Sequence, residues 1–391
     1  MTDGDTLGDR IRRLTRAERG VAVFVVGLVG VLLAGTLGGV FGPTYVLYLL
    51  GLVGMYVLLS FGLNVQWGYA GLINFSVAAF FGLGAYGTAL LTADNSPIAG
   101  GVSPVVGLVV GLGLAAVLAV AIGIPTLRLR TDYLAIASLG LAEVVRLVVR
   151  NERQWTNGSA GLRGIPGFFE GWPVLAQLPE TLPGLRVEVV PGSPIFVQTP
   201  FWQAALNVGL VFVFVAVTYL LLRRLHRSPW GRVLRTIRSD EDLAAALGRD
   251  TYRFKMQAFV LGSVIAALAG VFYAHLNLFV SPGDLEPINT FYVWIAVILG
   301  GSGSNRGAMF GGFVVIAIRE GTRFVDSFGG LPVDVAPLRL LVIGLLIVLV
   351  MRFRPEGVLP PQRELIWPAA LADAETPERG PDTAADGGDE S

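Results

Sequence analysis

Residues Arg223–Lys255 read RRLHRSPWGRVLRTIRSDEDLAAALGRDTYRFK and form a long polar interruption between two apolar runs of the chain. The stretch holds ten basic side chains, among them His226 and the only lysine, Lys255. Ser239 is a good helix N-cap, and Asp242 three residues later completes a Ser-x-x-Asp capping box. The pattern predicts a helix that begins at Ser239, inside a segment too polar to cross a membrane.

This predicted helix is short and has a clear end. Asp240 and Glu241 follow the cap and place negative charge at the positive end of the helix dipole. The body of the helix consists of Leu243, Ala244, Ala245, Ala246 and Leu247. Gly248 suits the position that ends a helix, and Asp250 or Thr251 can cap a second helix. We predict a short helix lying crosswise at a membrane surface, where another protein can push on it.

The composition decides the class of protein. Of 391 residues, 53% are hydrophobic and only 15% are charged, and the mean hydropathy is +0.65. Because soluble globular domains carry about 25% charged residues, we expect an all-α, polytopic integral membrane protein surrounded by the lipid bilayer. The chain has no cysteine, which excludes disulfides and thiolate chemistry.

Apolar runs divide the chain, and a run of about 20 residues is needed to cross a bilayer. Five runs precede the insert, at Val21–Phe41, Tyr45–Asn64, Gly71–Leu91, Val105–Leu127 and Tyr133–Val149. Five more follow it, at Phe201–Leu222, Met256–Phe279, Phe291–Gly301, Ala308–Ile318 and Leu338–Met351. Five arginines before the first run place the N-terminus in the cytoplasm, since cytoplasmic segments carry an excess of basic residues.

These runs separate segments of different composition. We expect a cytoplasmic N-terminal segment 1–20, a first transmembrane half 21–149, an extracellular insert 150–200, one transmembrane helix 201–222, a cytoplasmic loop 223–255, a second transmembrane half 256–352 and a cytoplasmic acidic tail 353–391. The insert contains β-like stretches such as Leu185–Val190. The tail is rich in Pro, Ala and acidic residues, which predicts disorder, and it serves either a high-salt cytoplasm or plain solubility.

The late glycine-rich stretch Gly300–Gly307 leaves two topologies open. It separates two short apolar runs, which form either a hairpin of half-length helices or one broken span. The hairpin gives ten crossings with both termini in the cytoplasm, whereas one broken span gives nine and places Arg352 and Arg354 outside. The positive-inside rule prefers ten crossings at the plasma membrane.

The spans offer little for chemistry. We predict no catalytic residue and no metal site, since His226 and His275 are isolated, and we interpret Glu143 and Arg146 as a local ion pair. Spans one to four and the span after the insert carry no ionisable residue in their central parts, which argues against proton coupling. A P-loop needs Gly-Lys-Ser/Thr, but Lys255 follows a phenylalanine. Any ATP-driven step therefore requires a separate subunit.

Two glycine-rich breaks, one in each half of the chain, point to a central pathway, because broken helices expose peptide groups that can line a cavity. Polar residues accompany both breaks, and we take them as candidates for the translocation pathway: Asn64, Gln66, Asn74, Ser76, Ser302, Ser304 and Asn305. The alternative for each is that it hydrogen-bonds one helix to another.

Several blocks resemble the permeases of branched-chain amino acid ABC transporters. Gly68–Tyr86 (GYAGLINFSVAAFFGLGAY) is similar to their early glycine-rich motif, and Leu127–Ile136 to the block that follows it. Thr156–Pro166 (TNGSAGLRGIP) resembles a motif of the LivM branch, with Asn157 where glycine is usual. Ser228–Arg238 with Ala244–Gly248 resembles the cytoplasmic loop that docks the ATPase, and the late glycine-rich turn also matches. The resemblance spans roughly residues 66–360.

The resemblance implies a permease subunit that pairs with a LivH-type permease, two cytoplasmic ATPase subunits and an external substrate-binding protein. From the predicted helix and its glycine end we assign ATPase coupling to Ser239, Asp240, Glu241, Ala244, Ala245, Ala246, Leu247 and Gly248. The alternative for the acidic residues Asp240, Glu241 and Asp242 is that they form only a solvated helix start. The resemblance implies no enzyme activity and no cofactor on this chain, because ATP and Mg²⁺ would be bound by the ATPases, and no nucleic acid as a partner. A permease for urea or short amides and an ATP-independent secondary transporter stay open as alternatives.

Overall fold

The computed structural model describes residues 16–38, 41–170, 185–190, 193–197, 199–328 and 335–361. The expected disorder of the acidic tail falls on residues outside this part of the chain. In the described part, ten long helices form the body: α2 (Arg16–Leu37), α3 (Pro43–Leu63), α4 (Val77–Thr92), α5 (Pro104–Thr126), α6 (Thr131–Asn151), α9 (Thr199–Arg227), α12 (Thr251–Asn277), α13 (Pro287–Gly300), α14 (Asn305–Phe328) and α15 (Val335–Phe353). The expected all-α, polytopic architecture is confirmed.

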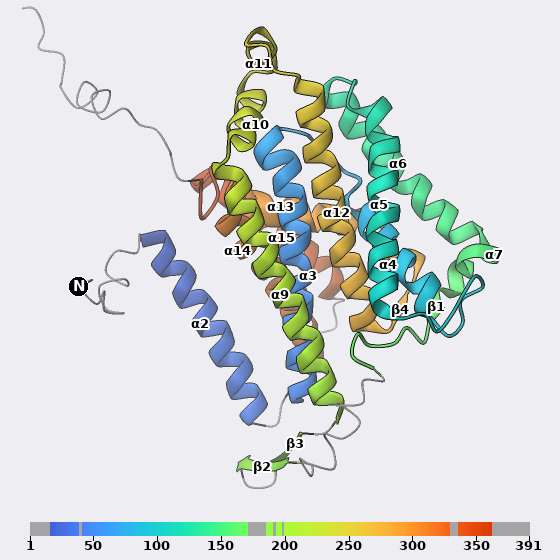
Figure 1. The fold of residues 1–391 in the computed structure, drawn as a ribbon. Helices are drawn as coiled ribbons and strands as arrows, with labels where there is room; N and C mark the ends of the chain where they lie inside the picture. The colour runs from blue at the N-terminus through green and yellow to red at the C-terminus, as the bar shows by residue number, and fades with distance from the viewer. Residues whose placement is uncertain are drawn as a thin grey trace, which may run out of the picture.

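Short elements occupy the two ends of this bundle (Figure 1). At one end α10 (Pro229–Ser239) and α11 (Glu241–Ala246) connect α9 to α12. At the other end lie β1 (Leu162–Arg163) paired with β4 (Phe279–Val280), and β2 (Leu185–Val190) paired with β3 (Ser193–Val197). A π-helical turn η1 (Asn64–Tyr69), the short helices α7 (Arg153–Thr156) and η2 (Gly158–Ala160), and η3 (Pro282–Leu285) complete the described elements.

The core of the bundle is built on α3, α4 and α12. Of the five described helices that are long and apolar enough to cross a membrane, α3 and α12 are mostly buried inside the protein. Glycines let these helices approach closely. A Cβ on Gly84 of α4 would collide with the Ala267 carbonyl of α12, and a Cβ on Gly270 of α12 would collide with the Phe81 carbonyl of α4.

The outer helices expose apolar side chains to the surroundings. No residue in the membrane-spanning part of α2 is fully buried, and α5 and α9 expose residues such as Val109, Val117 and Val213. Such a surface is stable only against lipid or another apolar helix. The chain is therefore a membrane-embedded, multi-pass protein.

The third predicted span is shorter than expected. The sequence places a helix over Gly71–Leu91, but α4 begins only at Val77, and residues 71–76 have no regular structure. Gly71 has φ +73°, a conformation that ends the preceding helix, and the Asn74 side chain accepts the backbone N–H of Ser76 at 2.8 Å. The first glycine-rich break therefore consists of the π-helical turn Asn64–Tyr69 at the end of α3 and the irregular stretch 71–76 that follows it.

The late glycine-rich stretch forms a hairpin. A Cβ on Gly311 of α14 would collide with the carbonyl of Ala296 on α13, and Gly307 and Gly300 approach each other in the same way nearer the turn. Gly300 lies against Gly307 close to the turn, and Ala296 lies against Gly311 farther from it. Contacts of this kind join two antiparallel helices. The structure thus favours the hairpin over one broken span, although α14, with 24 residues, is not the half-length helix that was predicted.

Candidate functional site

The first candidate site is the surface formed by α10, α11 and the start of α12. Ser228 caps α10, where its hydroxyl accepts the N–H of Gly231 at 3.5 Å. Leu234 and Ile237 on one face of α10 are buried against the bundle. Because the apolar face is fixed in this way, α10 holds the following helix α11 at the end of the molecule, beyond the membrane-spanning helices (Figure 1).

The predicted cap of α11 is wrong by one residue. Ser239 is the last residue of α10, and its hydroxyl donates to the Arg235 carbonyl at 3.0 Å. Asp240 is the N-cap, since its carboxylate accepts the N–H of Leu243 at 2.9 Å. The reason is that burial of Ile237 extends α10 through Ser239, so the next residue must turn the chain. The helix is also shorter than predicted and ends at Ala246.

The joint between α11 and α12 is built as the sequence predicts. Gly248 has φ +73°, and its N–H donates to the Ala245 carbonyl at 2.9 Å. Asp250 caps α12 by accepting the N–H of Arg253 at 3.1 Å. The ammonium of Lys255 lies 2.6 Å from the Glu241 carboxylate and links the two helices directly. The start of α12 is therefore tied directly to α11.

One face of α11 is apolar and lacks cover in the described part of the chain. Leu243 and Leu247 are 51% and 67% exposed, whereas Ala244 between them is fully buried. A groove of about 460 Å³ runs beside this face, between α10 and the start of α12, and Trp230, Val233 and Phe254 are among its walls. An apolar helix face next to a groove can receive another protein.

The second candidate site is the pair of glycine-rich breaks, which the fold brings together. The Asn64 side chain accepts the N–H of Gly303 at 2.7 Å and donates to the Asn305 side chain at 3.2 Å. The Tyr69 hydroxyl donates to the same Asn305 oxygen. The first break, at the end of α3, is thus bonded to the hairpin turn between α13 and α14, more than 200 residues away in the chain.

The other predicted pathway residues form a separate buried network. Gln66 accepts from the Asn74 side chain at 2.8 Å and donates to the Phe259 carbonyl of α12 at 2.9 Å. The Ser76 hydroxyl donates to the other end of the Asn74 amide at 2.5 Å. Asn64, Gln66, Asn74 and Ser76 are all 2% exposed or less. In this conformation they bond one helix to another, so a contact with substrate stays a prediction.

Arg238, at the end of α10, connects the two candidate sites. Its guanidinium donates to the Gly68 carbonyl in the first break and to the Ser302 hydroxyl in the hairpin turn, the latter at 3.1 Å. Partial burial lowers the pKa of this guanidinium because desolvation disfavours its charged form. The sequence gives no signal that separates Arg238 from the other basic residues of this loop, so its role was not predicted.

Ser304, another predicted pathway residue, stabilises the fold, because its hydroxyl accepts the N–H of Gly307 at the start of α14.

Glu143 and Arg146 form the predicted local ion pair at 2.5 Å. His275 has two partners, the Thr88 hydroxyl at 2.9 Å and the Pro166 carbonyl at 2.7 Å. Among the described residues there is no group of three or more His, Cys, Asp or Glu side chains placed to hold a metal ion.

The motif Thr156–Pro166 packs at the opposite end of the bundle. Asn157, which stands where glycine is usual, has φ 62°, and its side chain donates to the Gly161 carbonyl at 2.9 Å. Asparagine tolerates this left-handed conformation better than most residues, which explains the exchange. Strand β1 of this motif pairs with β4 directly after α12.

Comparisons with known proteins agree with these features. Residues 45–351 match the family described as "Branched-chain amino acid transport system / permease component". The high-affinity branched-chain amino acid transport system permease protein LivM of Escherichia coli (strain K12) is 31% identical over 321 residues, which cover 79% of this chain and 68% of that protein. The probable branched-chain amino acid transport permease protein LivM of Methanocaldococcus jannaschii is 27% identical, over 81% of this chain and 93% of that protein.

A more distant relative is the permease protein LivH of the same system in Escherichia coli (strain K12), 26% identical over 66% of this chain and 79% of that protein. These relatives are named for branched-chain amino acid transport and do not favour the alternative of a urea or amide permease. No solved structure shows a significant similarity to this chain.

Proposed function

Because the chain belongs to the family of permease components of branched-chain amino acid transport systems, we propose that it forms half of the translocation pathway of an ATP-driven importer. The observation that carries this proposal is the exposed, capped helix α11, joined to α12 through Gly248 and Lys255. A bundle without an energy source of its own needs such a surface to receive work from outside.

The proposed importer has four further components. A LivH-type permease would complete the membrane pathway, two cytoplasmic ATPase subunits would hydrolyse ATP, and an external binding protein would deliver the amino acid. ATP and Mg²⁺ would be held by the ATPases, so this chain itself needs no cofactor. In the plasma membrane, α10 and α11 would face the cytoplasm together with both termini, and the end with β1 and β4 would face outward.

One ATPase would dock on α11 and the adjacent groove. Leu243 and Leu247 would enter its surface, with Ser239 to Gly248 forming the contact. When the ATPase dimer closes, α11 moves, and the salt bridge between Glu241 and Lys255 passes the motion to α12. Arg238 passes it at the same time to the two glycine-rich breaks, because it is bonded to Gly68 and Ser302.

The breaks would then form the inner part of the pathway. In the present conformation the polar side chains of the breaks form hydrogen bonds within the protein: Asn64, Gln66, Asn74, Ser76, Ser302 and Asn305. Movement of α10 away from the breaks would release Ser302 and the Gly68 carbonyl. Separation of the first break from α12 and from the hairpin turn would release the other polar groups toward a passing solute. The same residues would then bond one helix to another in one conformation and contact the solute in the other.

Reconstitution tests this proposal. The complete complex in proteoliposomes, with the binding protein outside and ATP inside, is expected to accumulate radiolabelled leucine, isoleucine or valine. This chain alone is expected to transport none of them, with or without ATP. Uptake by the chain alone would establish a secondary transporter instead, and calorimetry on the cognate binding protein would show whether urea or an amide replaces the amino acid.

A further inference from the structure

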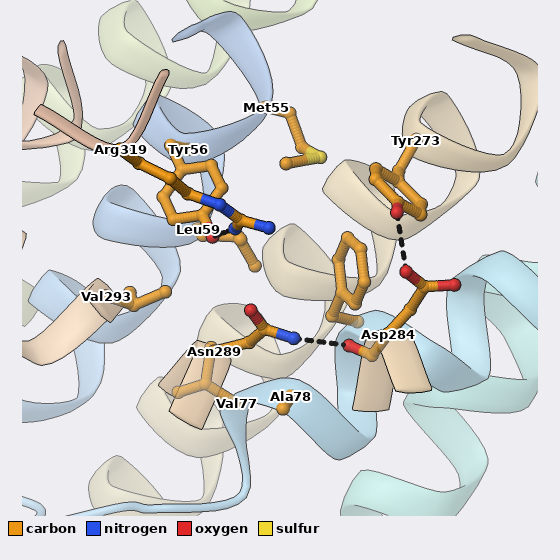
Figure 2. Close-up of a pocket in the computed structure, with 11 residues that line it drawn as sticks. Met55, Tyr56, Leu59, Val77, Ala78, Tyr273, Asp284, Asn289, Val293 and Arg319 are labelled. Carbon is orange, nitrogen blue, oxygen red and sulfur yellow. Dashed lines mark hydrogen bonds between the residues drawn. The ribbon is translucent and has the colours of Figure 1, made fainter. Parts of the chain in front are cut away.

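A cavity between α3, α4, α12, α13 and α14 carries opposite charges on its two sides (Figure 2). Arg319 of α14 enters from one side, above the ring of Tyr56. Asp284 of η3 and Asn289 of α13 lie on the other side. Apolar side chains fill much of the wall between them: Met55, Leu59, Val77 and Val293. This cavity is distinct from the glycine-rich breaks and the α11 surface.

The positive side of the cavity is held rigidly. The guanidinium of Arg319 lies over the rings of Tyr56 and Tyr292, 5.8 and 5.6 Å from their centroids. One terminal nitrogen, Nη1, donates to the Tyr56 hydroxyl at 2.5 Å, and Nε lies 3.8 Å from the Glu320 carboxylate. In the described part of the chain no hydrogen bond reaches Nη2. The fixed guanidinium therefore keeps a donor for a further acceptor.

The negative side is fixed in the same manner. The Asp284 carboxylate accepts the Tyr273 hydroxyl at 2.6 Å through one oxygen, and the Ser281 N–H at 2.8 Å through the other. Asn289 donates to the Asp284 carbonyl at 3.0 Å, which leaves its side-chain oxygen without a hydrogen bond among the described residues. A carboxylate oxygen with one donor and an amide oxygen with none form a pair of acceptors suited to an ammonium group.

Ionised groups among membrane-spanning helices are costly, and they mark functional sites by default. A ligand that suits this cavity must accept from Arg319, donate to Asp284 and Asn289, and place an aliphatic group against the apolar wall. A neutral α-amino acid has these three parts, with its carboxylate and ammonium on one carbon. Urea has no charge to satisfy Arg319 or Asp284 and no aliphatic group.

From this geometry we propose that the cavity binds the zwitterion of an aliphatic α-amino acid as it crosses the membrane. Arg319 receives the carboxylate, Asp284 and Asn289 receive the ammonium, and the aliphatic wall receives the side chain. This inference rests on the proposed function, to which it adds a substrate site on the permease itself.

The cavity is small in this conformation. Its volume of about 30 Å³ holds only a water molecule or two. Met55 lies at its edge (Figure 2) and, being unbranched and flexible, can swing aside to admit a larger group. The amino acid would thus enter when the helices part and be released when they return.

Transport by the complete complex in proteoliposomes tests the charged side chains. Arg319→Gln, Asp284→Asn and Asn289→Ala are each expected to lower leucine uptake per ATP hydrolysed, by roughly tenfold to a hundredfold for the two charged positions. Arg319→Lys is expected to restore part of the loss, because it keeps the charge without the planar fork. Arg224→Gln, at the exposed end of α9 and outside the cavity, is the matched control and is expected to transport like the wild type.

Photo-leucine, whose side chain carries a diazirine, locates the site directly. On illumination during turnover it is expected to label peptides that contain Met55 or Val293. Excess leucine should remove the label, whereas leucinamide and 4-methylpentanoate, which each lack one charged group, should not. If Arg319→Gln does not assemble, the label and the Asn289→Ala variant still decide the question.

The outcomes separate this inference from the proposed function. Two results would refute the cavity site and leave the importer intact. In the first, the wild-type complex takes up leucine but photo-leucine labels other peptides. In the second, the Arg319→Gln complex transports leucine as well as the control variant does. A wild-type complex that accumulates no branched-chain amino acid refutes the importer, and the amino-acid site falls with it.

Discussion

Replacement of Arg238 by methionine tests how force reaches the glycine-rich breaks. The substitution keeps the apolar stem of the side chain but removes the guanidinium that donates to Gly68 and Ser302. The α11 surface and the Gly248 joint are left unchanged. The expected result is a complex that still hydrolyses ATP but transports fewer molecules for each ATP consumed.

The magnitude follows from the two hydrogen bonds. Hydrogen bonds to charged groups contribute about 1.5–3 kcal/mol each. The Arg238 side chain is partly exposed, so water screens the interaction and replaces some of the lost bonds. A net loss of about 1–2 kcal/mol in coupling free energy remains, which corresponds to a roughly fivefold to thirtyfold fall in the ratio of uptake to hydrolysis.

The assay measures leucine uptake and phosphate release in the same proteoliposomes. Arg224→Met is the matched control, because Arg224 is exposed in the last turn of α9 and belongs to neither candidate site. Arg238→Lys is expected to be intermediate, since an ammonium reaches one acceptor more readily than two. A ratio of uptake to hydrolysis in Arg238→Met equal to that of Arg224→Met would refute the reasoning.

Three further predictions concern the joint and the hairpin. Asp240→Ala is expected to lower the thermal stability of the purified complex and its ratio of uptake to ATP hydrolysis, because it loses about 1 kcal/mol of helix capping. Ser239→Ala should change neither quantity. A larger effect of Ser239→Ala than of Asp240→Ala would restore Ser239 as the cap of α11. Gly248→Pro is expected to abolish ATP-coupled uptake, because proline cannot adopt φ +73°, but not to prevent membrane insertion. Gly248→Asn should retain most of the uptake. Wild-type uptake by the proline variant would contradict the role of Gly248 as the joint. Gly311→Val is expected to prevent stable assembly, seen as aggregation in gel filtration, since its side chain would overlap the Ala296 carbonyl; a monodisperse variant would show that the hairpin can open.

The helices were predictable because long apolar runs have few alternatives in a chain of this composition. Even the hairpin turn was recognisable from its glycines. The unwound stretch 71–76 was not, because Leu72, Ile73 and Phe75 continue the apolar pattern that helices also show. What breaks the helix there is the positive φ of Gly71 together with the Asn74 side chain, and Asn74 depends on partners in η1 and α13.

The α11 cap shows a different limit. Ser239 and Asp240 are both good N-caps, and local propensity does not choose between them. The choice depends on Ile237, whose burial keeps α10 regular for one more turn. The sequence contains the candidates, but tertiary packing selects among them.

The charged cavity was beyond sequence reasoning for a geometric reason. Arg319 directly follows an apolar run, and Asp284 lies in a connection between two spans, so neither stands out at mid-membrane in the chain. They meet only because η3 caps the space between α12 and α14. An ionisable residue at the end of a predicted span was the one available signal.

The two candidate sites and the cavity lie on the same helices, which explains how one movement can serve all three. Arg238 holds the turn that begins α14, and Arg319 lies fourteen residues further along that helix, about 21 Å away at 1.5 Å per residue. The Gly248 joint begins α12, whose Tyr273 holds Asp284 on the opposite side of the cavity. In the proposed mechanism, force at the α11 end would act on the two charged walls through different helices. Any difference in how far α12 and α14 move would change the separation of Arg319 and Asp284, so the proposed power stroke would itself widen or narrow the cavity.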